Sequence, residues 1–403
     1  MMTVAVIGGG AAGMMAAITA ASGNENHVIL LERQQRVGRK LLSTGNGRCN
    51  LSNLHAAPEY YHGDDPDFIR PAMEQCSVEE TLRLFAGMGL VARAEEGGRV
   101  YPLSNSANSV VDVLRFAMES AGVEIRTSCP VVDVRRSGKA FVIQLEEETL
   151  TADKIIVACG GCAGAKLGGV QDGYRILQSL GHTRTKLFPS LVQLTVRDNR
   201  YPRAMKGVKA QARLTLTGEA QAVGRGEILF TEKGVSGPAI FDLSRHVSVV
   251  PEGKIGLSMD FMEDFSEEEI LTMLQNRCRA LPENPAGDLL VGTVHNRLGK
   301  MLVRYAEIDG NLTLAQLTEI QLRRAAAAMK EFRLDVKGTE GFDQAQVTAG
   351  GIRTAEFDPD TMQSRLVPGV YACGEVLDID GDCGGFNLQW AWSSGRLAGR
   401  LLP

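Results

Sequence analysis

A glycine-rich turn between a strand and a helix at the start of the chain constrains the fold most. The apolar run Thr3–Ile7 is predicted to be a buried strand, and Gly8-Gly-Gly10-Ala-Ala-Gly13 follows it and opens a helix of small residues. In such a turn the first glycine permits the bend, the second lets backbone approach a pyrophosphate, and the third permits close helix–strand packing. A second predicted strand, His27–Leu31, ends at Glu32, whose carboxylate can accept hydrogen bonds from an unphosphorylated ribose. The pattern predicts a dinucleotide-binding unit.

A second glycine-rich segment lies close to the other end of the chain. The apolar run 369–373 stops at Gly374-Glu375, an acidic loop follows, and a segment of helical composition begins near Asn387. Such a loop brings backbone N–H groups and a helix N-terminus to a flat polar ligand. A carboxylate between glycines at a strand end is a poor core residue, so Glu375 is interpreted as a ligand-binding residue. The alternative is that the glycines before the helix only cap a structural element.

Composition and charge exclude several classes of protein. The sequence has 403 residues, of which 44% are apolar and 23% charged, ordinary values for a globular protein of two or three domains. The formal net charge of -5 predicts no strong attraction to nucleic acid or anionic membranes, and no apolar run suits a membrane span. Eight scattered cysteines favour a reducing cytoplasm over a disulfide framework. No residues have the spacing of a metal site, and nothing indicates an oligomeric state.

The character of the sequence changes near residue 190. Alternating apolar and polar residues, typical of half-buried strands, begin there, and helical patterns follow. The strand and glycine character of the N-terminal part then returns. We therefore predict an α/β fold in which a discontinuous Rossmann-like domain, 1–189 with 341–403, is interrupted by an insert at 190–340. The insert is expected to hold a β-barrel-like part at about 190–260 and a helical part at about 261–340.

Five motifs along the chain occur together in one family of known proteins. They are Gly8-Gly-Gly-Ala-Ala-Gly13, Gly45-Asn-Gly-Arg-Cys-Asn50, Phe230-Thr with Gly234-Val-Ser-Gly-Pro-Ala239, Val347-Thr-Ala-Gly-Gly-Ile352, and Gly374-Glu-Val-Leu-Asp-Ile-Asp-Gly-Asp382 through Gly395. With them the chain resembles, over essentially its whole length, the bacterial NAD(P)/FAD-dependent oxidoreductases that include aminoacetone oxidase and a bile-acid 3-oxo-Δ4/Δ6 reductase. The resemblance implies a glutathione-reductase-style FAD domain, split by an insert that covers the flavin. It leaves the substrate open, because the family is functionally heterogeneous.

The residue patterns and the resemblance together predict how non-covalent FAD lies along the first domain. The glycine turn meets the pyrophosphate, Glu32 takes the adenosine ribose, Val131 presents backbone to adenine, and Glu375 binds the ribitol chain. The helix near Asn387 points N–H groups at the flavin pyrimidine, where they stabilise reduced-flavin charge by about 0.3–1 kcal/mol when exposed. Lys40 either offsets phosphate charge or is an ordinary surface base. The residues expected to contact FAD are Gly8, Gly10, Ala12, Gly13, Glu32, Arg33, Lys40, Gly47, Arg48, Cys49, Asn50, Val131, Cys159, Gly160, Gly161, Gly374, Glu375, Asp382, Gly385, Asn387 and Leu388.

The substrate-side candidates follow from the resemblance and from polarity near glycine turns. They are Arg48, Arg99, Tyr101, Glu232 and Thr348. Arg48 would bind a substrate carboxylate or carbonyl, or pair with a local acid. Many relatives have histidine at the position of Glu232, so a histidine acid is not available there. Ordinary structural roles are the alternative for each of these side chains.

Two cysteine features admit more than one interpretation. The family places the loop of Cys49 beside the isoalloxazine, so this residue is either a nucleophile or a small packing residue. No histidine lies near it in sequence to lower its pKa, which favours packing. Cys159-Gly-Gly-Cys162 has the spacing of a redox dithiol, yet no clear helix follows to stabilise a thiolate. Relatives more often carry a small residue or threonine where this chain has Cys159.

The predicted function is that of a FAD-dependent oxidoreductase that exchanges a hydride between flavin N5 and a small organic substrate. Reduction of a C=C bond conjugated to a ketone, with NAD(P)H as a transient donor, is favoured over amine oxidation with O₂. An RNA-modifying flavoprotein is a second hypothesis, since folate-dependent tRNA methyltransferases share this style of FAD domain. It requires a basic face and a reactive cysteine, and the net charge opposes it. A flavin-binding module without turnover is the third.

Overall fold

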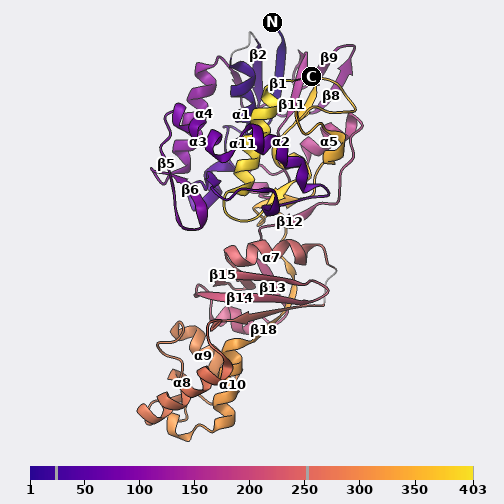
Figure 1. The fold of residues 1–403 in the computed structure, drawn as a ribbon. Coiled ribbons are helices and arrows are strands. Elements are labelled where there is room, and N and C mark those ends of the chain that lie inside the picture. The colour runs from indigo at the N-terminus through magenta and orange to yellow at the C-terminus, as the bar shows by residue number, and fades with distance from the viewer. Residues whose placement is uncertain (23–25, 251–253, 403) are drawn as a thin grey trace. The chain divides into compact units, whose positions relative to one another are not determined.

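The chain forms two compact units in the computed structural model, which describes residues 1–22, 26–250 and 254–402 (Figure 1). The first unit combines Met1–Phe188 with Ala345–Pro403, and the second, here called the insert, is Pro189–Gln344. Each unit has a separate hydrophobic core. The first unit is therefore assembled from both ends of the chain, and the insert folds around its own apolar residues.

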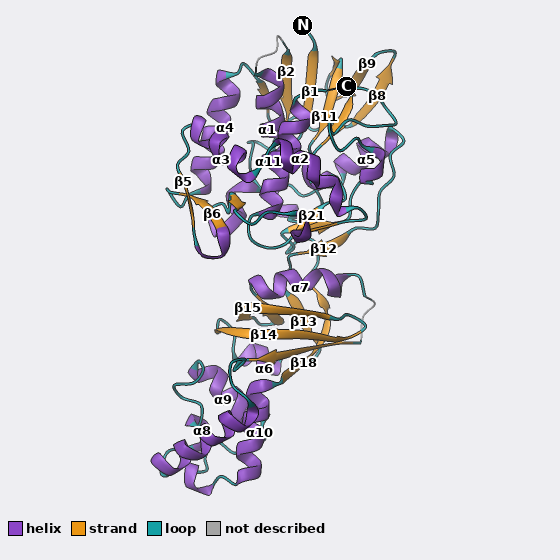
Figure 2. Ribbon diagram, in the orientation of Figure 1, coloured by secondary structure: helices purple, strands orange, loops and turns teal. Residues whose placement is uncertain are grey.

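The first unit is built on a parallel sheet with the strand order β20-β11-β1-β2-β7. Figure 2 labels β11, β1 and β2 of this sheet. Its central strand is apolar from Val4 to Ile7 and buried, which suits a parallel sheet covered on both faces. The register places Val4 opposite Val28 on one side and Lys154 on the other. This sheet confirms the predicted Rossmann-like fold. Its strands are β1 (Thr3–Ile7), β2 (His27–Leu31), β7 (Glu124–Arg126), β11 (Lys154–Val157) and β20 (Val370–Ala372).

Helices and small antiparallel sheets surround the parallel sheet. The helices are α1 (Ala11–Ala21), α2 (Arg70–Gln75), α3 (Val78–Gly87), α4 (Ala107–Ser120), α5 (Asp172–Ser179) and α11 (Phe386–Gly399). The additional strands are β3 (Ser52–Asn53), β4 (Tyr61–His62), β5 (Ala92–Ala94), β6 (Arg99–Pro102), β8 (Asp133–Ser137), β9 (Ala140–Gln144), β10 (Thr149–Ala152), β12 (Phe188–Ser190), β19 (Val347–Ala349) and β21 (Asp380–Gly381). Among the described residues, none of the helices has the length and apolarity that crossing a bilayer requires.

Helices α1 and α11 pack backbone against backbone, although they lie at opposite ends of the sequence. A Cβ on Gly395 would lie 2.4 Å from the carbonyl oxygen of Ala12, and one on Gly399 would lie 2.5 Å from that of Ala16. Side chains larger than hydrogen have no room at these two positions. The small residues of both helices are therefore a condition for this contact, which joins the two ends of the chain.

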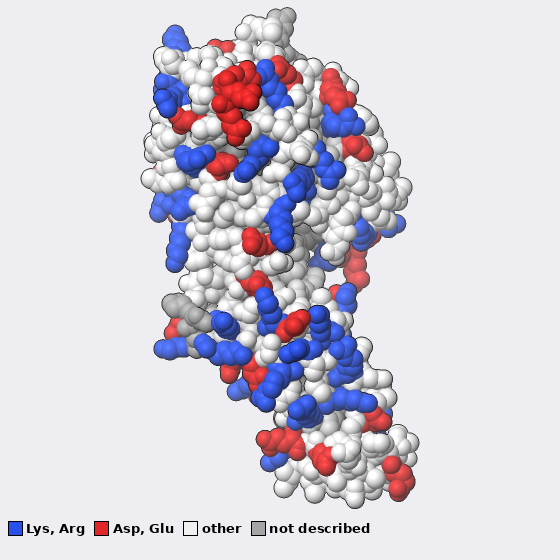
Figure 3. All heavy atoms as spheres, turned by 180° about the vertical axis from the view of Figure 1, so that it is seen from behind, with Lys and Arg blue, Asp and Glu red and all other residues white. Residues whose placement is uncertain are grey.

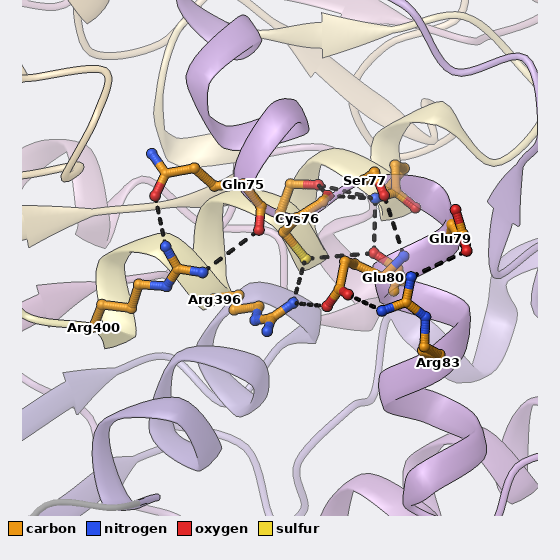
Figure 4. A network of polar contacts seen from close by, with 11 residues as sticks. Gln75, Cys76, Ser77, Glu79, Glu80, Arg83, Arg396 and Arg400 are labelled. Carbon is orange, nitrogen blue, oxygen red and sulfur yellow. Dashed lines mark hydrogen bonds and ion pairs between the residues drawn. The ribbon is translucent and has the colours of Figure 1, made fainter.

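Polar contacts fasten the C-terminal half of α11 to α2 and α3 (Figure 4). Arg396 Nη1 donates to Glu80 Oε2 at 2.9 Å and lies 3.7 Å from the sulfur of Cys76. Arg400 Nη1 donates to Gln75 Oε1 at 2.6 Å. The hydrogen bond from Arg396 lowers the pKa of the Glu80 carboxyl. The C-terminal end of α11 is thereby held by close packing against α1, by the ion pair of Arg396 with Glu80 and by the hydrogen bond from Arg400.

The insert contains a closed barrel with the strand order β13-β16-β15-β14-β17-β18. Inward-facing residues alternate along its strands, as in β17, where Ile255, Leu257 and Met259 are buried. This confirms that the insert holds a β-barrel-like part, although the last barrel strand, at Phe332–Thr339, lies in the segment 261–340 that was predicted to be helical. The strands are β13 (Leu194–Val196), β14 (Lys209–Gly218), β15 (Ala222–Phe230), β16 (Gly234–Ser236), β17 (Ile255–Asp260) and β18 (Phe332–Thr339). The helices are α6 (Arg200–Ala204), α7 (Pro238–Ser248), α8 (Glu267–Ala280), α9 (Asn296–Tyr305) and α10 (Glu319–Lys330).

The contact between α1 and α11 predicts that a larger residue at Gly395 destabilises the protein. Gly395→Ala should lower the free energy of unfolding by about 1–3 kcal/mol, because the added methyl group has no space. Gly87→Ala at the exposed end of α3 is the matched control, since its Cβ would meet nothing within 4 Å. Chemical denaturation of both variants measures the difference. Equal stability of the two variants would show that the helices do not depend on this close approach.

Candidate functional site

The glycine turn before α1 leaves an open space above its middle glycine. Gly8 has a φ of 108°, and a Cβ there would lie 2.5 Å from the carbonyl oxygen of Ala158. A Cβ on Gly13 would lie 1.9 Å from the carbonyl oxygen of Gly8, whereas one on Gly10 would meet nothing within 4 Å. Helix α1 has no side-chain cap at Gly10, so its first N–H groups are available to an anion. The turn has the geometry of a pyrophosphate cradle.

Glu32 follows β2 and is held against this turn by backbone donors. Its Oε2 accepts from Gly9 N at 2.7 Å, and its Oε1 accepts from Gln34 N at 2.7 Å. Burial raises the pKa of the Glu32 carboxyl, although these two hydrogen bonds favour the charged form. Each oxygen has a second lone pair for a ligand hydroxyl. Arg33 points outward, is exposed, and contacts Asp172 at 3.3 Å.

A second polar cluster forms where β11 and β20 end. Lys40 Nζ donates to Glu375 Oε2 at 2.7 Å, and Thr348 N donates to Glu375 Oε1 at 2.9 Å. A Cβ on Gly161 would lie 2.5 Å from Glu375 Oε1 and 2.4 Å from Thr348 Oγ1. The structure thus brings together four residues that the sequence suggested from separate segments. A carboxylate fixed by an ammonium and a backbone N–H is suited to accept hydrogen bonds from a polyol.

Gly374 joins this cluster to the glycine turn. Its φ is 74°, and a Cβ there would lie 2.8 Å from the Cβ of Ala12 in α1. Gly374 N donates to Ser394 Oγ of α11 at 3.0 Å. Gly160, with a φ of 69°, precedes Gly161 and has nothing within 4 Å of the place of a Cβ. Both turns of the predicted site therefore lie at the N-terminal part of α1.

Helix α11 begins at a left-handed glycine. Gly385 has a φ of 105° and gives the helix no side-chain cap, and a Cβ there would lie 2.3 Å from the carbonyl oxygen of Ser52. Asn387 turns its amide back to Gly381, accepting from the backbone N at 2.8 Å and donating to the backbone O at 2.6 Å. Asp382 Oδ1 contacts His62 Nε2 at 2.7 Å. The structure therefore gives the Asn387 and Asp382 side chains local partners that hold the loop in place, while backbone N–H groups of the first turn face outward from the helix end.

The loop of Arg48, Cys49 and Asn50 is held by local contacts. Arg48 Nη2 donates to Glu95 Oε1 at 2.6 Å and to Asn105 Oδ1 at 2.7 Å. Its guanidinium carbon lies 4.0 Å from the centre of the buried Tyr101 ring. Of the two alternatives for Arg48, the structure shows pairing with a local acid. Asn50 is partly buried, and its Oδ1 has no hydrogen-bond partner within the described residues.

The remaining predicted residues lie in different surroundings. Glu232 belongs to the insert, where it is exposed and accepts a hydrogen bond from Lys206 Nζ at 3.0 Å. This bond lowers the pKa of the Glu232 carboxyl. Val131 is buried in the loop before β8, and Leu388 lies in the first turn of α11. Gly47, with a φ of 83°, lies in the loop that leads to Arg48.

The surroundings of Cys49, Cys159 and Cys162 favour the protonated thiol. Cys49 is fully buried, and burial raises the pKa of its thiol to about 12. Burial likewise raises the pKa of the Cys159 thiol to about 12, and this thiol donates to the carbonyl oxygen of Ile7 at 3.4 Å. Cys162 faces Thr348, with 3.8 Å between sulfur and hydroxyl, and burial raises its pKa also. Cys49, Cys159 and Cys162 are free thiols.

The surroundings of two buried polar side chains, Tyr174 and His182, were not predicted from the sequence. Tyr174 of α5 is 1% exposed, and its hydroxyl has no hydrogen-bond partner among the described residues. Burial raises the pKa of this hydroxyl, Glu375 and Cys162 raise it further, and an interaction with the Thr348 side chain opposes the rise. No spacing rule in the sequence connects Tyr174 with the cluster, although it follows directly on Asp172-Gly173.

His182 is the second such group and has the partners of a hydrolytic triad. Its Nδ1 lies 2.9 Å from Glu356 Oε2, and its Nε2 lies 3.0 Å from Ser364 Oγ. The Ser364 oxygen is buried and also accepts from the backbone N of Leu366 at 3.1 Å and of Val367 at 2.8 Å. Because both lone pairs are occupied, this serine is a structural group and not a nucleophile. Burial lowers the pKa of His182, which keeps the ring neutral.

Fold and site together define a Rossmann-type dinucleotide-binding protein. Similarity to known proteins specifies the family. The chain belongs to the family described as HI0933-like protein Rossmann domain, whose model matches residues 2–401. It is 38% identical to a 3-dehydro-bile acid delta(4,6)-reductase of Clostridium scindens, over 93% of this chain and 92% of that protein. It is 31% identical to a ribosomal RNA dihydrouridine synthase of Escherichia coli, over 91% of this chain and 90% of that protein. The chain is an oxidoreductase of this family.

The fold also occurs in a solved structure of low sequence identity. The 3-ketosteroid delta1-dehydrogenase of Sterolibacterium denitrificans, in complex with 1,4-androstadiene-3,17-dione, matches with a TM-score of 0.51 and 13% identity. The match covers 99% of each chain. This likeness concerns the architecture, a dinucleotide-binding unit interrupted by a second unit.

The thiol environments predict an order of chemical modification. At pH 8 a thiol with a pKa near 12 is about one part in ten thousand thiolate, so Cys49 and Cys159 should resist iodoacetamide. Cys129 and Cys278 are partly exposed, as Cys159 is, but burial raises the pKa of their thiols less, so they should be alkylated first. Peptide mass spectrometry of the folded protein over time measures this order. Early alkylation of Cys49 would restore the interpretation of this residue as a nucleophile.

Proposed function

We propose that the protein is a flavoprotein that binds FAD and reduces a C=C bond conjugated to a carbonyl group. The observation that carries this proposal is the joining of two half-sites in one unit. The Gly10 turn and Glu32 would bind the adenosine diphosphate end of FAD. The Glu375 cluster and the start of α11 would bind its flavin end. A cytoplasmic location and the domain limits predicted from the sequence are part of the same proposal.

The residues present fit FAD in charge and in shape. Backbone N–H groups at the start of α1 would hold the pyrophosphate, and Glu32 would accept from the adenosine ribose. Glu375, oriented by Lys40 and Thr348, would accept from the ribitol hydroxyls. Bound FAD supplies hydride transfer at its N5 atom. The uncapped N-terminus of α11 would stabilise negative charge on the pyrimidine edge and so raise the flavin potential.

The names of the two relatives describe chemically similar reductions. A delta(4,6)-reductase acting on a 3-dehydro bile acid removes a double bond that is conjugated to a 3-oxo group. A dihydrouridine synthase saturates the uridine C5=C6 bond, which is conjugated to the C4 carbonyl. Conjugate reduction of an enone adds a hydride to the carbon β to the carbonyl and a proton to the α carbon, and in a 4,6-dien-3-one the hydride can instead enter at the δ carbon. A common ability to reduce such bonds supports a reductase over an O₂-dependent amine oxidase, with a nicotinamide dinucleotide as the proposed electron donor.

Anaerobic half-reactions test this function. The FAD-loaded protein, mixed with NADH or NADPH, should lose its oxidised-flavin absorbance. A 3-oxo-Δ4 steroid or a uridine-containing RNA added next should restore it and yield the saturated product. Oxygen uptake with aminoacetone, without bleaching by either nicotinamide, would instead favour the amine oxidase.

A second candidate function is reduction of uridine in RNA, and a cluster of bases on the insert favours it. Exposed Lys and Arg side chains gather on this unit (Figure 3). Arg297 Nη2 donates to the carbonyl oxygen of Ala204 at 2.7 Å, and Nη1 donates to that of Lys206 at 3.1 Å, so the start of α9 adjoins the end of α6. Six bases against three paired acids can contact phosphates despite the negative net charge. This basic cluster comprises Arg197, Arg200, Arg203, Lys206, Lys233 and Arg297.

Charge reversal tests the RNA candidate. Arg197→Glu with Arg203→Glu should weaken binding of a ribosomal RNA fragment about tenfold or more and reduce its salt dependence. Arg323→Glu with Arg324→Glu on α10 of the same unit is the matched control, because these arginines already pair with acids. Filter binding at several salt concentrations measures both. Equal loss in the two variants would show that the basic cluster has no special role.

A further inference from the structure

Arg99 places a cation beside the positive end of α11 without a counter-ion. The residue opens β6, is half-buried, and its guanidinium forms no ion pair or hydrogen bond within the described residues. Its Nε lies 3.6 Å from the place of a Cβ on Gly384, the residue before the uncapped start of α11 at Gly385. Helix N-termini carry partial positive charge, so a cation beside one is unfavourable unless an anion joins them.

The strand pairing around Arg99 fixes its position. Arg99 pairs with Asn53 of β3, and Asn53 Nδ2 donates to the carbonyl oxygen of Gly384 at 2.9 Å. Directly opposite residues of an antiparallel pair have their side chains on one face of the sheet. Both side chains therefore reach the same loop, and Arg99 is held where this loop enters α11.

The neighbouring arginines differ from Arg99 because they share an acid. Glu95 Oε1 accepts from Arg48 at 2.6 Å and from Arg93 at 3.2 Å. These contacts, with the hydrogen bond from Arg48 the largest, lower the pKa of the Glu95 carboxyl. Asp382, in the loop before α11, pairs with His62 at 2.7 Å. These acids are engaged elsewhere, which leaves the charge of Arg99 unmatched within the described part of the chain.

We propose that Arg99 binds an anionic group of the substrate, a carboxylate or a phosphate ester, beside the first turn of α11. A guanidinium offers parallel N–H donors that match two oxygens of such a group, and the helix N–H groups favour the same charge. In the proposed binding of FAD the phosphates lie at the Gly10 turn, so the permanent charge of the cofactor does not meet Arg99. The inference rests on the proposed function and adds that the reduced substrate is an anion.

Two pairs of probes that differ in one anionic group test this inference. One pair is a 3-oxo-4-ene steroid acid with its methyl ester, and the other is uridine 5′-monophosphate with uridine. Titration into the FAD-loaded protein without an electron donor, followed by flavin absorbance, gives each dissociation constant. The charged member of at least one pair should bind roughly tenfold more tightly than the neutral member. A preference in the steroid pair identifies a carboxylate, and one in the nucleotide pair identifies a phosphate.

Three arginine variants assign the preference to Arg99. Arg99→Gln should abolish it, whereas Arg99→Lys should keep part of it, because lysine retains the charge without the paired donors. The melting temperature of FAD-free Arg99→Gln should be unchanged or higher, because the substitution breaks no contact within the described residues. Arg93→Gln in the same small sheet is the matched control, since Arg93 already pairs with Glu95. This control should keep the full preference.

Three results would overturn the inference while the reductase proposal stands. The first is equal binding within both pairs by the wild-type protein. The second is a preference that survives Arg99→Gln or is lost equally in Arg93→Gln. The third is an intact preference in Arg99→Gln together with a lower flavin reduction potential, which would assign Arg99 to the charge of reduced flavin. A wild-type protein that binds no FAD would overturn both proposals.

Discussion

The backbone contact between α1 and α11 is the interaction on which the rest of the first unit depends. Gly395 and Gly399 lie against the carbonyl oxygens of Ala12 and Ala16, so the two helices approach more closely than side chains normally allow. Gly374 extends the same contact to the turn before Glu375. Two glycine-rich turns from opposite ends of the chain are thereby placed at one helix N-terminus. Without this close approach the turn at Gly10 and the turn before Glu375 would not lie next to each other.

Backbone groups, more than charged side chains, give the site its electrostatic character. Glu32 and Glu375 are each oriented by backbone N–H donors, and Lys40 is the cation that contacts the second of them. The thiols beside them are kept neutral by burial. Donors fixed in the fold lose little freedom when a ligand binds, and they need no reorganisation when charge develops on it. The arrangement suits a cofactor that performs the chemistry while the protein holds and tunes it.

Predictions from the sequence were most successful at positions where the backbone geometry allows only one type of residue. The roles of Gly8 and Gly13 followed from spacing, because a tight turn and a close helix–strand contact each require glycine. The contact between Lys40 and Glu375 was not predicted, because 335 residues separate them and Lys40 was interpreted as a base that offsets phosphate charge or lies on the surface. The partners of Arg48 could not be predicted, because Glu95 and Asn105 reach it through tertiary packing. Asn387 was predicted at a helix start, but its side chain bonds to Gly381, a choice that only loop geometry decides.

The insert starts and ends within the sequence of the first unit, yet its barrel and helices form a core of their own. Residues that change in this core need not be compensated in the parallel sheet, because the two sets of packed side chains are distinct. Substitutions within the insert core should therefore have little effect on the stability of the parallel sheet. The glycine turns and the parallel sheet of the first unit can in this way stay unchanged while the insert varies.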